Sequence, residues 1–148
     1  MLMKYLPIDY LINLKQQLLT CQLINMKQAL MVFIGGGFGS VARYFLGKWF
    51  NNIENYFPVG TLLANVLGSL LMGFLIGYLA KTSNISETQS LLLATGFCGG
   101  FTTFSTFAYE NQLFLKNGDY VSFLSYTLGT LILGFLAVFL GLYFSKLL

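Results

Sequence analysis

The stretch GFCGGFTTFSTF, Gly96–Phe107, combines residue types that rarely occur together in one apolar segment. It holds three glycines, four phenylalanines and four side-chain hydroxyls. Each glycine inside a helix costs about 1 kcal/mol of helix propensity, so the stretch predicts a helix that is broken near its middle. At membrane depth such a break is tolerated only where protein or a cavity covers the freed backbone groups. Carbonyl groups freed in this way form a natural cation site.

The residues after the predicted break have types and spacings that could serve an anion. Phe104 and Phe107 stand three apart and therefore share a helix face. The edge of an aromatic ring is positive, so these rings can face an anion without binding it as tightly as an arginine would. Thr102, Ser105 and Thr106 add hydroxyls at spacings of three and four. A simpler reading is a core or lipid-facing phenylalanine pair, beside hydroxyls that bond to their own helix backbone.

Other polar residues stand within apolar segments, where they are expensive and tend to line interiors or pathways. Asn65 needs a partner from elsewhere in the chain, because a buried amide has two donors and an acceptor that it cannot satisfy locally. Arg43 either extends to the lipid headgroups or takes part in function. Glu110 is the one acid within an apolar segment.

The composition places these groups in a membrane. The chain of 148 residues is 56% hydrophobic and 9% charged, whereas an ordinary soluble domain is about a quarter charged. The absence of histidine removes His-based triads, metal sites and proton relays, so an enzyme is the least expected class. The two cysteines, Cys21 and Cys98, indicate neither a disulfide nor a metal site. The positive residues are scattered, so no nucleic-acid partner is expected.

The elements that must position these residues are four membrane spans, by the criterion of about 20 apolar residues per span. They are expected at Lys27–Phe50, Val59–Ala80, Thr88–Phe114 and Tyr120–Ser145. The fold class is thus an all-α membrane protein whose third helix is broken. Residues 26–148 form the transmembrane domain, and residues 1–25 form an N-terminal extension, either an interfacial helix or a loose segment. Met26 is a second candidate for the start of translation.

Glycines recur in the other spans, for example Gly73 and Gly77 in GxxxG spacing and Gly134 and Gly141 in the last span. Small residues let helix backbones approach closely in a bilayer. We expect most of them to pack the helices of one chain and the remainder to form a dimer interface.

The positive charges predict no fixed orientation. From Met26 onward, Lys27, Lys81 and Lys146 lie on one side, and Lys48 and Lys116 lie on the other with Arg43 nearby. Because orientation follows the Lys and Arg bias of the short loops, this balance predicts a chain that inserts both ways. Lys4 and Lys15 would tilt the count if the extension stays on its side.

Three segments together resemble the Fluc (CrcB) family of fluoride channels. They are GGGFGSVARY, FPVGTLLANVLGSLLMG and GFCGGFTTFSTFAYE, in the family's order and spacing, and the resemblance covers essentially Met26–Ser145. It implies a multi-pass protein of the bacterial inner (plasma) membrane that lets fluoride leave the cell passively and so reduces its toxicity. It also implies an antiparallel homodimer of dual-topology subunits, with two pores and a central sodium ion.

The resemblance also assigns roles to particular residues. The sodium ligands would be the backbone carbonyls of Gly99 and Thr102, two from each subunit. The residues of the fluoride pathway would be Asn65, Phe104, Phe107, Ser105, Thr106, Thr130 and Arg43. Thr130 stands where the family is expected to have a serine, and Ser40 replaces the commoner alanine. A channel and a slow exchanger could both use these groups.

Two other functions fit a small four-span protein. One is a proton-coupled multidrug transporter, which would use Glu110 as its membrane-embedded carboxylate, although such transporters depend on an acid in the first span. The other is an accessory subunit of a larger membrane complex, which would explain the glycines but not the polar residues beside the predicted break.

Overall fold

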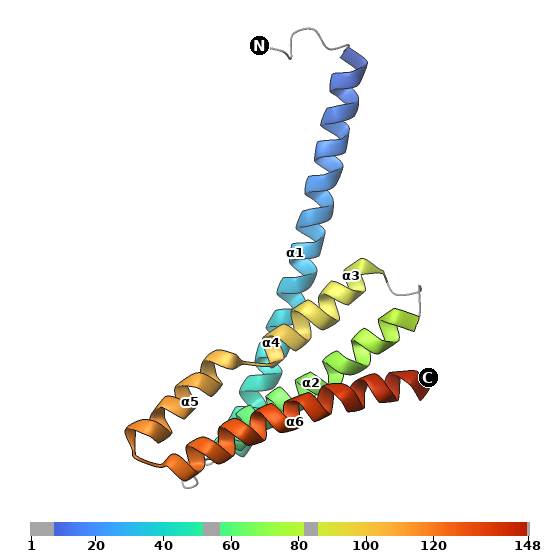
Figure 1. Cartoon of the computed structure of the whole chain (residues 1–148). Coiled ribbons are helices and arrows are strands. Elements are labelled where there is room, and N and C mark those ends of the chain that lie inside the picture. Colours follow the sequence, from blue (N-terminus) through green and yellow to red (C-terminus); the bar gives the residue numbers. More distant parts are fainter. Residues whose placement is uncertain (1–7, 52–56, 82–85, 148) are drawn as a thin grey trace.

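The computed structural model describes residues 8–51, 57–81 and 86–147, and in these ranges the chain is helical with no strand. The long helices are α1 (Ile8–Phe50), α2 (Val59–Lys81) and α6 (Tyr120–Leu147). Between α2 and α6 the chain forms α3 (Glu87–Ser90), the π-helix η2 (Leu91–Cys98), α4 (Gly99–Phe101) and α5 (Phe104–Lys116). Figure 1 shows α2 and α6 side by side, with α1 running at a steep angle to them.

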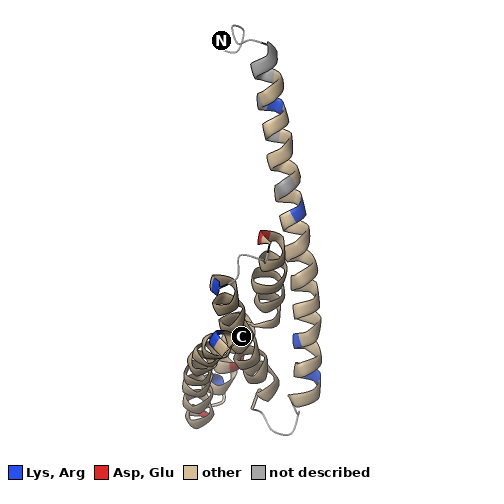
Figure 2. Ribbon diagram, turned by 90° about the vertical axis from the view of Figure 1, so that its right-hand side faces the viewer, with Lys and Arg blue, Asp and Glu red and all other residues tan. Residues whose placement is uncertain are grey.

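The prediction of four membrane spans is confirmed. Four stretches of helix are long and apolar enough to cross a bilayer: Lys15–Phe50, Val59–Lys81, Glu87–Lys116 and Tyr120–Leu147. The last three agree with the expected spans to within two residues at each end. Figure 2 shows long helical stretches without a charged residue, as a membrane span requires.

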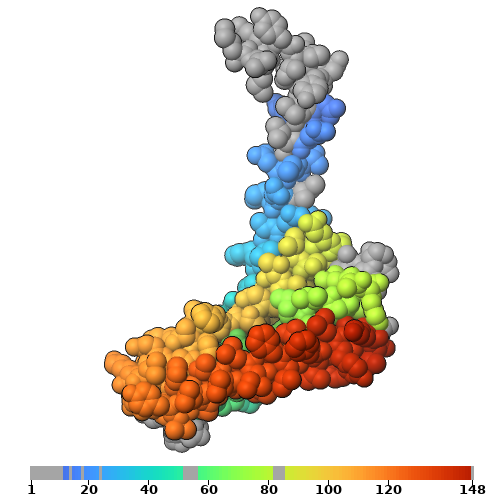
Figure 3. Space-filling model, in the orientation of Figure 1, coloured from blue at the N-terminus to red at the C-terminus, as the bar shows by residue number. Residues whose placement is uncertain are grey.

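The first helix begins earlier than the sequence pattern predicted. The first span was predicted to begin at Lys27, but α1 is continuous from Ile8 through that position. No glycine or proline occurs between Ile8 and Gly35 to interrupt it. A helix of 43 residues is about 64 Å long at 1.5 Å per residue, roughly twice the hydrocarbon thickness of a bilayer. Its N-terminal part therefore projects from the body of the molecule (Figure 3). Residues 1–7 of the predicted extension lie outside the described residues.

Glycines bring the helices into close contact. A Cβ atom on Gly73 or Gly141 of the α2–α6 pair would overlap the backbone of the other helix. A Cβ atom on Gly35, Gly39 or Gly100 would likewise overlap backbone atoms between α1 and the η2–α4 segment. These contacts confirm the expectation that glycines pack the helices of one chain, and they fix the segment that carries the candidate site against α1.

The positive residues at the helix ends lie on the same sides as the prediction of orientation assumed. Lys81 at the end of α2 donates from Nζ to the backbone oxygen of Lys146 at the end of α6, at 2.7 Å. Gln28 of α1 donates to Oε1 of Glu87, at the start of α3, at 3.0 Å. Lys27, Lys81 and Lys146 are therefore at the same end of their spans.

Candidate functional site

The backbone leaves the helical conformation at two threonines between α4 and α5. Thr102 has φ −80° and ψ 157°, and Thr103 has φ −151° and ψ 124°. Thr103 is the N-cap of α5, where its Oγ1 accepts a hydrogen bond from the amide of Thr106 at 3.3 Å. The glycines of this stretch are helical, and Gly96 and Gly100 lie in close contact with the backbone of α1. A threonine here satisfies an amide that the first turn of a helix leaves free.

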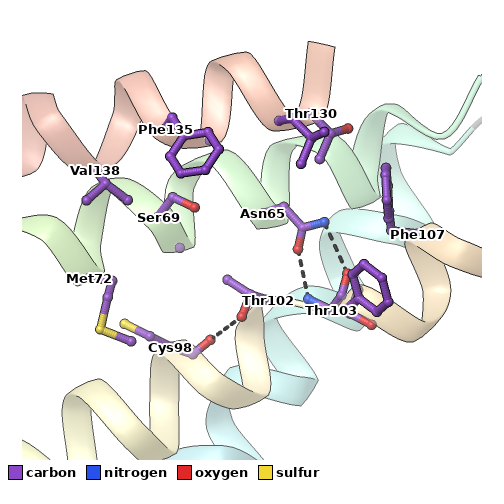
Figure 4. A pocket seen from close by; sticks show the side chains of 14 residues that line it. Asn65, Ser69, Met72, Cys98, Thr102, Thr103, Phe107, Thr130, Phe135 and Val138 are labelled. Atoms are coloured by element: carbon purple, nitrogen blue, oxygen red, sulfur yellow. Dashed lines mark hydrogen bonds between the residues drawn. The ribbon is translucent and has the colours of Figure 1, made fainter. Parts of the chain in front are cut away.

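Asn65 of α2 holds this extended backbone in place. Its Nδ2 donates to the carbonyl of Thr103 at 3.1 Å, and its Oδ1 accepts from the amide of Thr103 at 2.8 Å (Figure 4). The side-chain amide thus pairs with both polar groups of one residue, as a neighbouring strand would. The half-buried side-chain amide of Asn65 therefore has the partner from another segment that it requires.

The same geometry frees two carbonyl groups. In a continuous helix the carbonyl of Gly99 would accept from the amide of Thr103, and that of Thr102 would accept from the amide of Thr106. The Thr103 amide instead donates to Asn65, and the Thr106 amide donates to Thr103 Oγ1. Gly99 is exposed, and a Cβ atom built on it meets nothing within 4 Å. The two carbonyls predicted as cation ligands therefore do not receive the backbone hydrogen bonds that a continuous helix would give them.

Arg43 of α1 contacts the end of α4. Its Nε donates to the carbonyl of Gly100 at 3.2 Å, and Ser40 Oγ donates to the same carbonyl at 3.4 Å. A positive charge at the C-terminal end of a helix stabilises the free carbonyls there. This contact gives Arg43 a partner other than lipid headgroups, and it ties the segment before the two threonines to α1.

Phe104 and Phe107 lie together at the start of α5 but differ in their surroundings. Their ring centroids are 5.9 Å apart, which confirms the shared face. Phe107 is 8% exposed, with its ring 5.2 Å from that of Tyr126, whereas Phe104 is 80% exposed. Only Phe107 is therefore fixed by packing within one chain.

A cavity of 410 Å³ opens beside the two threonines, between α2, α6 and the third span. Its lining combines polar groups with apolar and sulfur-containing side chains, and none of the residues that line it is charged. Of the residues singled out in the sequence, it brings together Asn65, Thr102, Phe104, Phe107 and Thr130. Thr130 is one of the lining residues, and its buried Oγ1 atom has no hydrogen-bond partner.

Other predicted residues lie near this cavity but not in its lining. Thr103 Oγ1 donates to Thr106 Oγ1 at 3.1 Å and lies 3.4 Å from Ser105 Oγ, so both hydroxyls are paired with Thr103. Arg43 and Gly99 are likewise outside the lining. Thr103 was missed as a site residue, although a threonine just ahead of a helical run is a typical N-cap signal.

Glu110 is held by two hydroxyl groups. Its Oε1 accepts from Thr61 Oγ1 at 2.7 Å, and its Oε2 accepts from the Tyr126 hydroxyl at 2.6 Å. These bonds join α5 to α2 and α6 just beyond Phe107. No sequence pattern indicated Thr61 and Tyr126 as partners of Glu110, because contacts between helices that are distant in the sequence leave no local signal.

A known protein family matches the region of the chain that contains the two threonines, Asn65 and the phenylalanine pair. Residues 30–142 match the family described as CrcB-like protein, Camphor Resistance (CrcB). The chain belongs to the CrcB family. The match runs from within α1 to near the end of α6 and therefore includes every residue of the candidate site.

Individual relatives in the CrcB family support the match over most of the chain. A protein of Gloeothece citriformis is 47% identical over 116 residues, which are 78% of this chain and 94% of the relative. A protein of Chlorobium chlorochromatii is 45% identical over 75% of this chain and 86% of the relative. One of Pyrococcus furiosus is 41% identical over 78% of this chain and 93% of the relative. All three are named fluoride-specific ion channel FluC.

Proposed function

We propose that this chain is a fluoride-selective channel through which fluoride leaves the cell passively. Its relatives in the CrcB family carry that name. The observation that carries the proposal is the uncharged cavity, where the Asn65-held backbone, the phenylalanine pair and the unpartnered hydroxyl of Thr130 meet. A cell membrane, in which the four spans are embedded, is the location that this function requires.

The chemistry of the site fits a small and strongly hydrated anion. Fluoride accepts hydrogen bonds well, so a selective path must replace its water with good donors in a space too narrow for chloride. Thr130 Oγ1 has no partner, and the exposed edge of Phe104 adds a weak positive potential. No lysine or arginine lines the cavity. This suits conduction, because an ion must bind weakly enough to leave.

The functional unit is an antiparallel homodimer of subunits that insert in both orientations. The near balance of positive charges supports this arrangement, and so does the exposure of Phe104, whose ring lacks a full set of neighbours within one chain. Fusions of a reporter to the C-terminus test the orientation. Equal populations on the two sides of the membrane are expected, and a single orientation would contradict dual topology.

A structural sodium ion at the dimer interface would be held by the carbonyls of Gly99 and Thr102 from each subunit. The diversion of their helical donors to Asn65 and to Thr103 Oγ1 supports this fit, since carbonyl oxygens are the ligands that hard cations take. The ion would add a positive field and hold the two interrupted helices together. Replacing sodium by a large organic cation during purification is expected to destabilise the dimer, and unchanged dimer stability would contradict the site.

Fluoride efflux from liposomes containing the purified protein tests the function. A fluoride electrode follows release down a gradient, with chloride release measured in parallel and protein-free liposomes as the control. Fast fluoride release without chloride release is expected. If folded protein releases no fluoride, the proposal is wrong. Resistance to a cationic drug that is lost on changing Glu110 would then favour the multidrug transporter.

A further inference from the structure

The cavity beside the two threonines also holds two sulfur atoms from different spans. Cys98 ends the π-helix η2, and Met72 belongs to α2. Both line the cavity, and Figure 4 shows the two side chains extending toward each other. Cys98 is fully buried and lies in the wall of the cavity.

We propose that Cys98 and Met72 form a binding site for a soft monovalent cation of the Cu(I) and Ag(I) class. Thiolate and thioether sulfurs are the ligands that select such ions. The described part of the chain contains no group of three histidine, cysteine or acidic side chains, so ions that need such a cluster have no competing site there. Binding replaces the thiol proton of Cys98, which is released to water, and no electron is transferred.

The cavity that holds the two sulfur atoms reaches the surface of a single chain, because the exposed Phe104 also lines it. Thr130, whose buried Oγ1 atom has no hydrogen-bond partner, lines the cavity at its other end, near Asn65 and Phe107 (Figure 4).

The position of Cys98 gives the site a consequence for transport. Its carbonyl accepts from both the amide and the hydroxyl of Thr102, at 3.0 and 2.9 Å. The backbone of Cys98 is therefore bonded to the first of the two extended threonines. A cation held there occupies the cavity that the proposed fluoride path uses, so it blocks fluoride flux. This consequence rests on the proposed function, whereas cation binding does not.

Silver nitrate is the probe, in chloride-free buffer, and the detergent-purified full chain is the sample. The Cys21→Ser variant is the background, because Cys21 is exposed on α1 and would bind silver independently. Silver bound per chain is measured by equilibrium dialysis and mass spectrometry. We expect about one ion per chain in this background and none when Cys98→Ser is added.

Met72→Leu separates a two-sulfur site from a single reactive thiol. Loss of an outer-shell partner alone costs metal affinity about tenfold or more, so loss of the second ligand is expected to weaken silver binding by at least that factor. Met26→Leu is the matched control, because Met26 is exposed on α1, and it should bind as the background does. Equal affinity for silver in the Met72→Leu and Met26→Leu variants would overturn the proposal. This comparison remains valid even if the Cys98→Ser variant fails to fold.

Fluoride efflux in nitrate medium measures the block. Silver is expected to stop efflux in the Cys21→Ser background and to leave the added Cys98→Ser variant conducting. Silver binding with unaffected efflux would overturn the claim of a block. Absence of efflux before silver is added would count against the proposed function alone, since the binding measurements stand without it.

Discussion

The α2–α6 pair and the third span use glycine for the same purpose but differ in their backbones. In both regions a glycine lets two helices touch, as Gly73 does against Val138 and Gly100 does against Gly36. The α2–α6 pair remains regular throughout, whereas the third span contains a π-helix and two extended threonines. Close packing therefore does not by itself interrupt a helix.

The difference between the two regions is the supply of polar partners from neighbouring helices. Arg43 and Asn65 reach the backbone of the third span and bond to its free groups. In a bilayer, unpaired backbone groups cost several kcal/mol each, so an irregular backbone persists only where such partners exist. Substitutions in the third span or in its polar partners should consequently change transport, and substitutions at the glycine contacts between α2 and α6 should change stability.

The largest effect on transport is expected from Asn65→Asp. The aspartate keeps an acceptor for the Thr103 amide but loses the donor to the Thr103 carbonyl and adds a negative charge to the path. A buried acceptor without its donor costs roughly 1–3 kcal/mol, and the added charge repels the anion. Fluoride efflux should fall by at least about a hundredfold, since each 1.4 kcal/mol is a factor of ten. Efflux within twofold of the parent protein would contradict the role of Asn65.

A smaller loss of efflux is expected from Phe104→Ile and Phe107→Ile, about tenfold in each, because the positive ring edge is removed. The two variants are matched controls for stability. Phe107 packs against Tyr126, and such an aromatic pair contributes about 0.5–1.5 kcal/mol, so only Phe107→Ile should lower the melting temperature. The dimer should remain assembled in both, as measured by size-exclusion chromatography. Full efflux in both variants would remove the phenylalanine pair from the pathway.

Gly73→Ala probes the regular region. The added methyl group meets the backbone of Val138, and overpacking of this kind costs typically about 1–3 kcal/mol. The free energy of unfolding should fall accordingly in a detergent titration, while efflux per folded channel stays unchanged. Gly129→Ala is the control, because no atom lies within 4 Å of a Cβ atom there. Equal stability of the two variants would show that the α2–α6 contact is looser than the structure indicates.

The smallest effect is expected at Asp119, outside the spans. The side chain and the backbone amide of Ser122, the amide at 3.0 Å from Asp119 Oδ1, donate to the Asp119 carboxyl at the start of α6 and lower its pKa. Its stabilising contribution is therefore present above the ordinary aspartate pKa of about 3.9 and is lost as the pH falls through the lower folded-state value. Asp119→Ala should lower the melting temperature slightly at neutral pH and not at all at low pH. A difference that grows on acidification would contradict this sign.

The sequence was sufficient for the spans because apolar length alone decides whether a segment can cross a bilayer. The sequence was less reliable about where the first span begins and where the third span is interrupted. Polar residues of the extension such as Lys15 suggested that the first span begins at Lys27, but α1 continues through both positions, because no glycine or proline occurs between Ile8 and Gly35. The glycines of Gly96–Phe107 suggested the place of the interruption, yet Gly99 and Gly100 are helical and the extended residues are the two threonines after them.

Individual site residues could be predicted only where a local sequence pattern or the family resemblance indicated them. The phenylalanine pair follows from helical spacing, and Asn65 follows from its unsatisfiable amide. The contacts of Glu110 with Thr61 and Tyr126, and of Arg43 with Gly100, join residues from separate spans. Such contacts depend on how the helices cross, which no short stretch of sequence encodes.

The reversal potential of the purified protein in a planar bilayer tests the central claim most directly. Fluoride is placed in a tenfold gradient, and chloride in the opposite gradient, so that the two ions predict potentials of opposite sign. A selective fluoride channel gives a current that reverses near the fluoride equilibrium potential, about 59 mV from zero for a tenfold gradient of a monovalent ion. A reversal near the chloride potential, or the absence of any current from folded protein, would contradict the account.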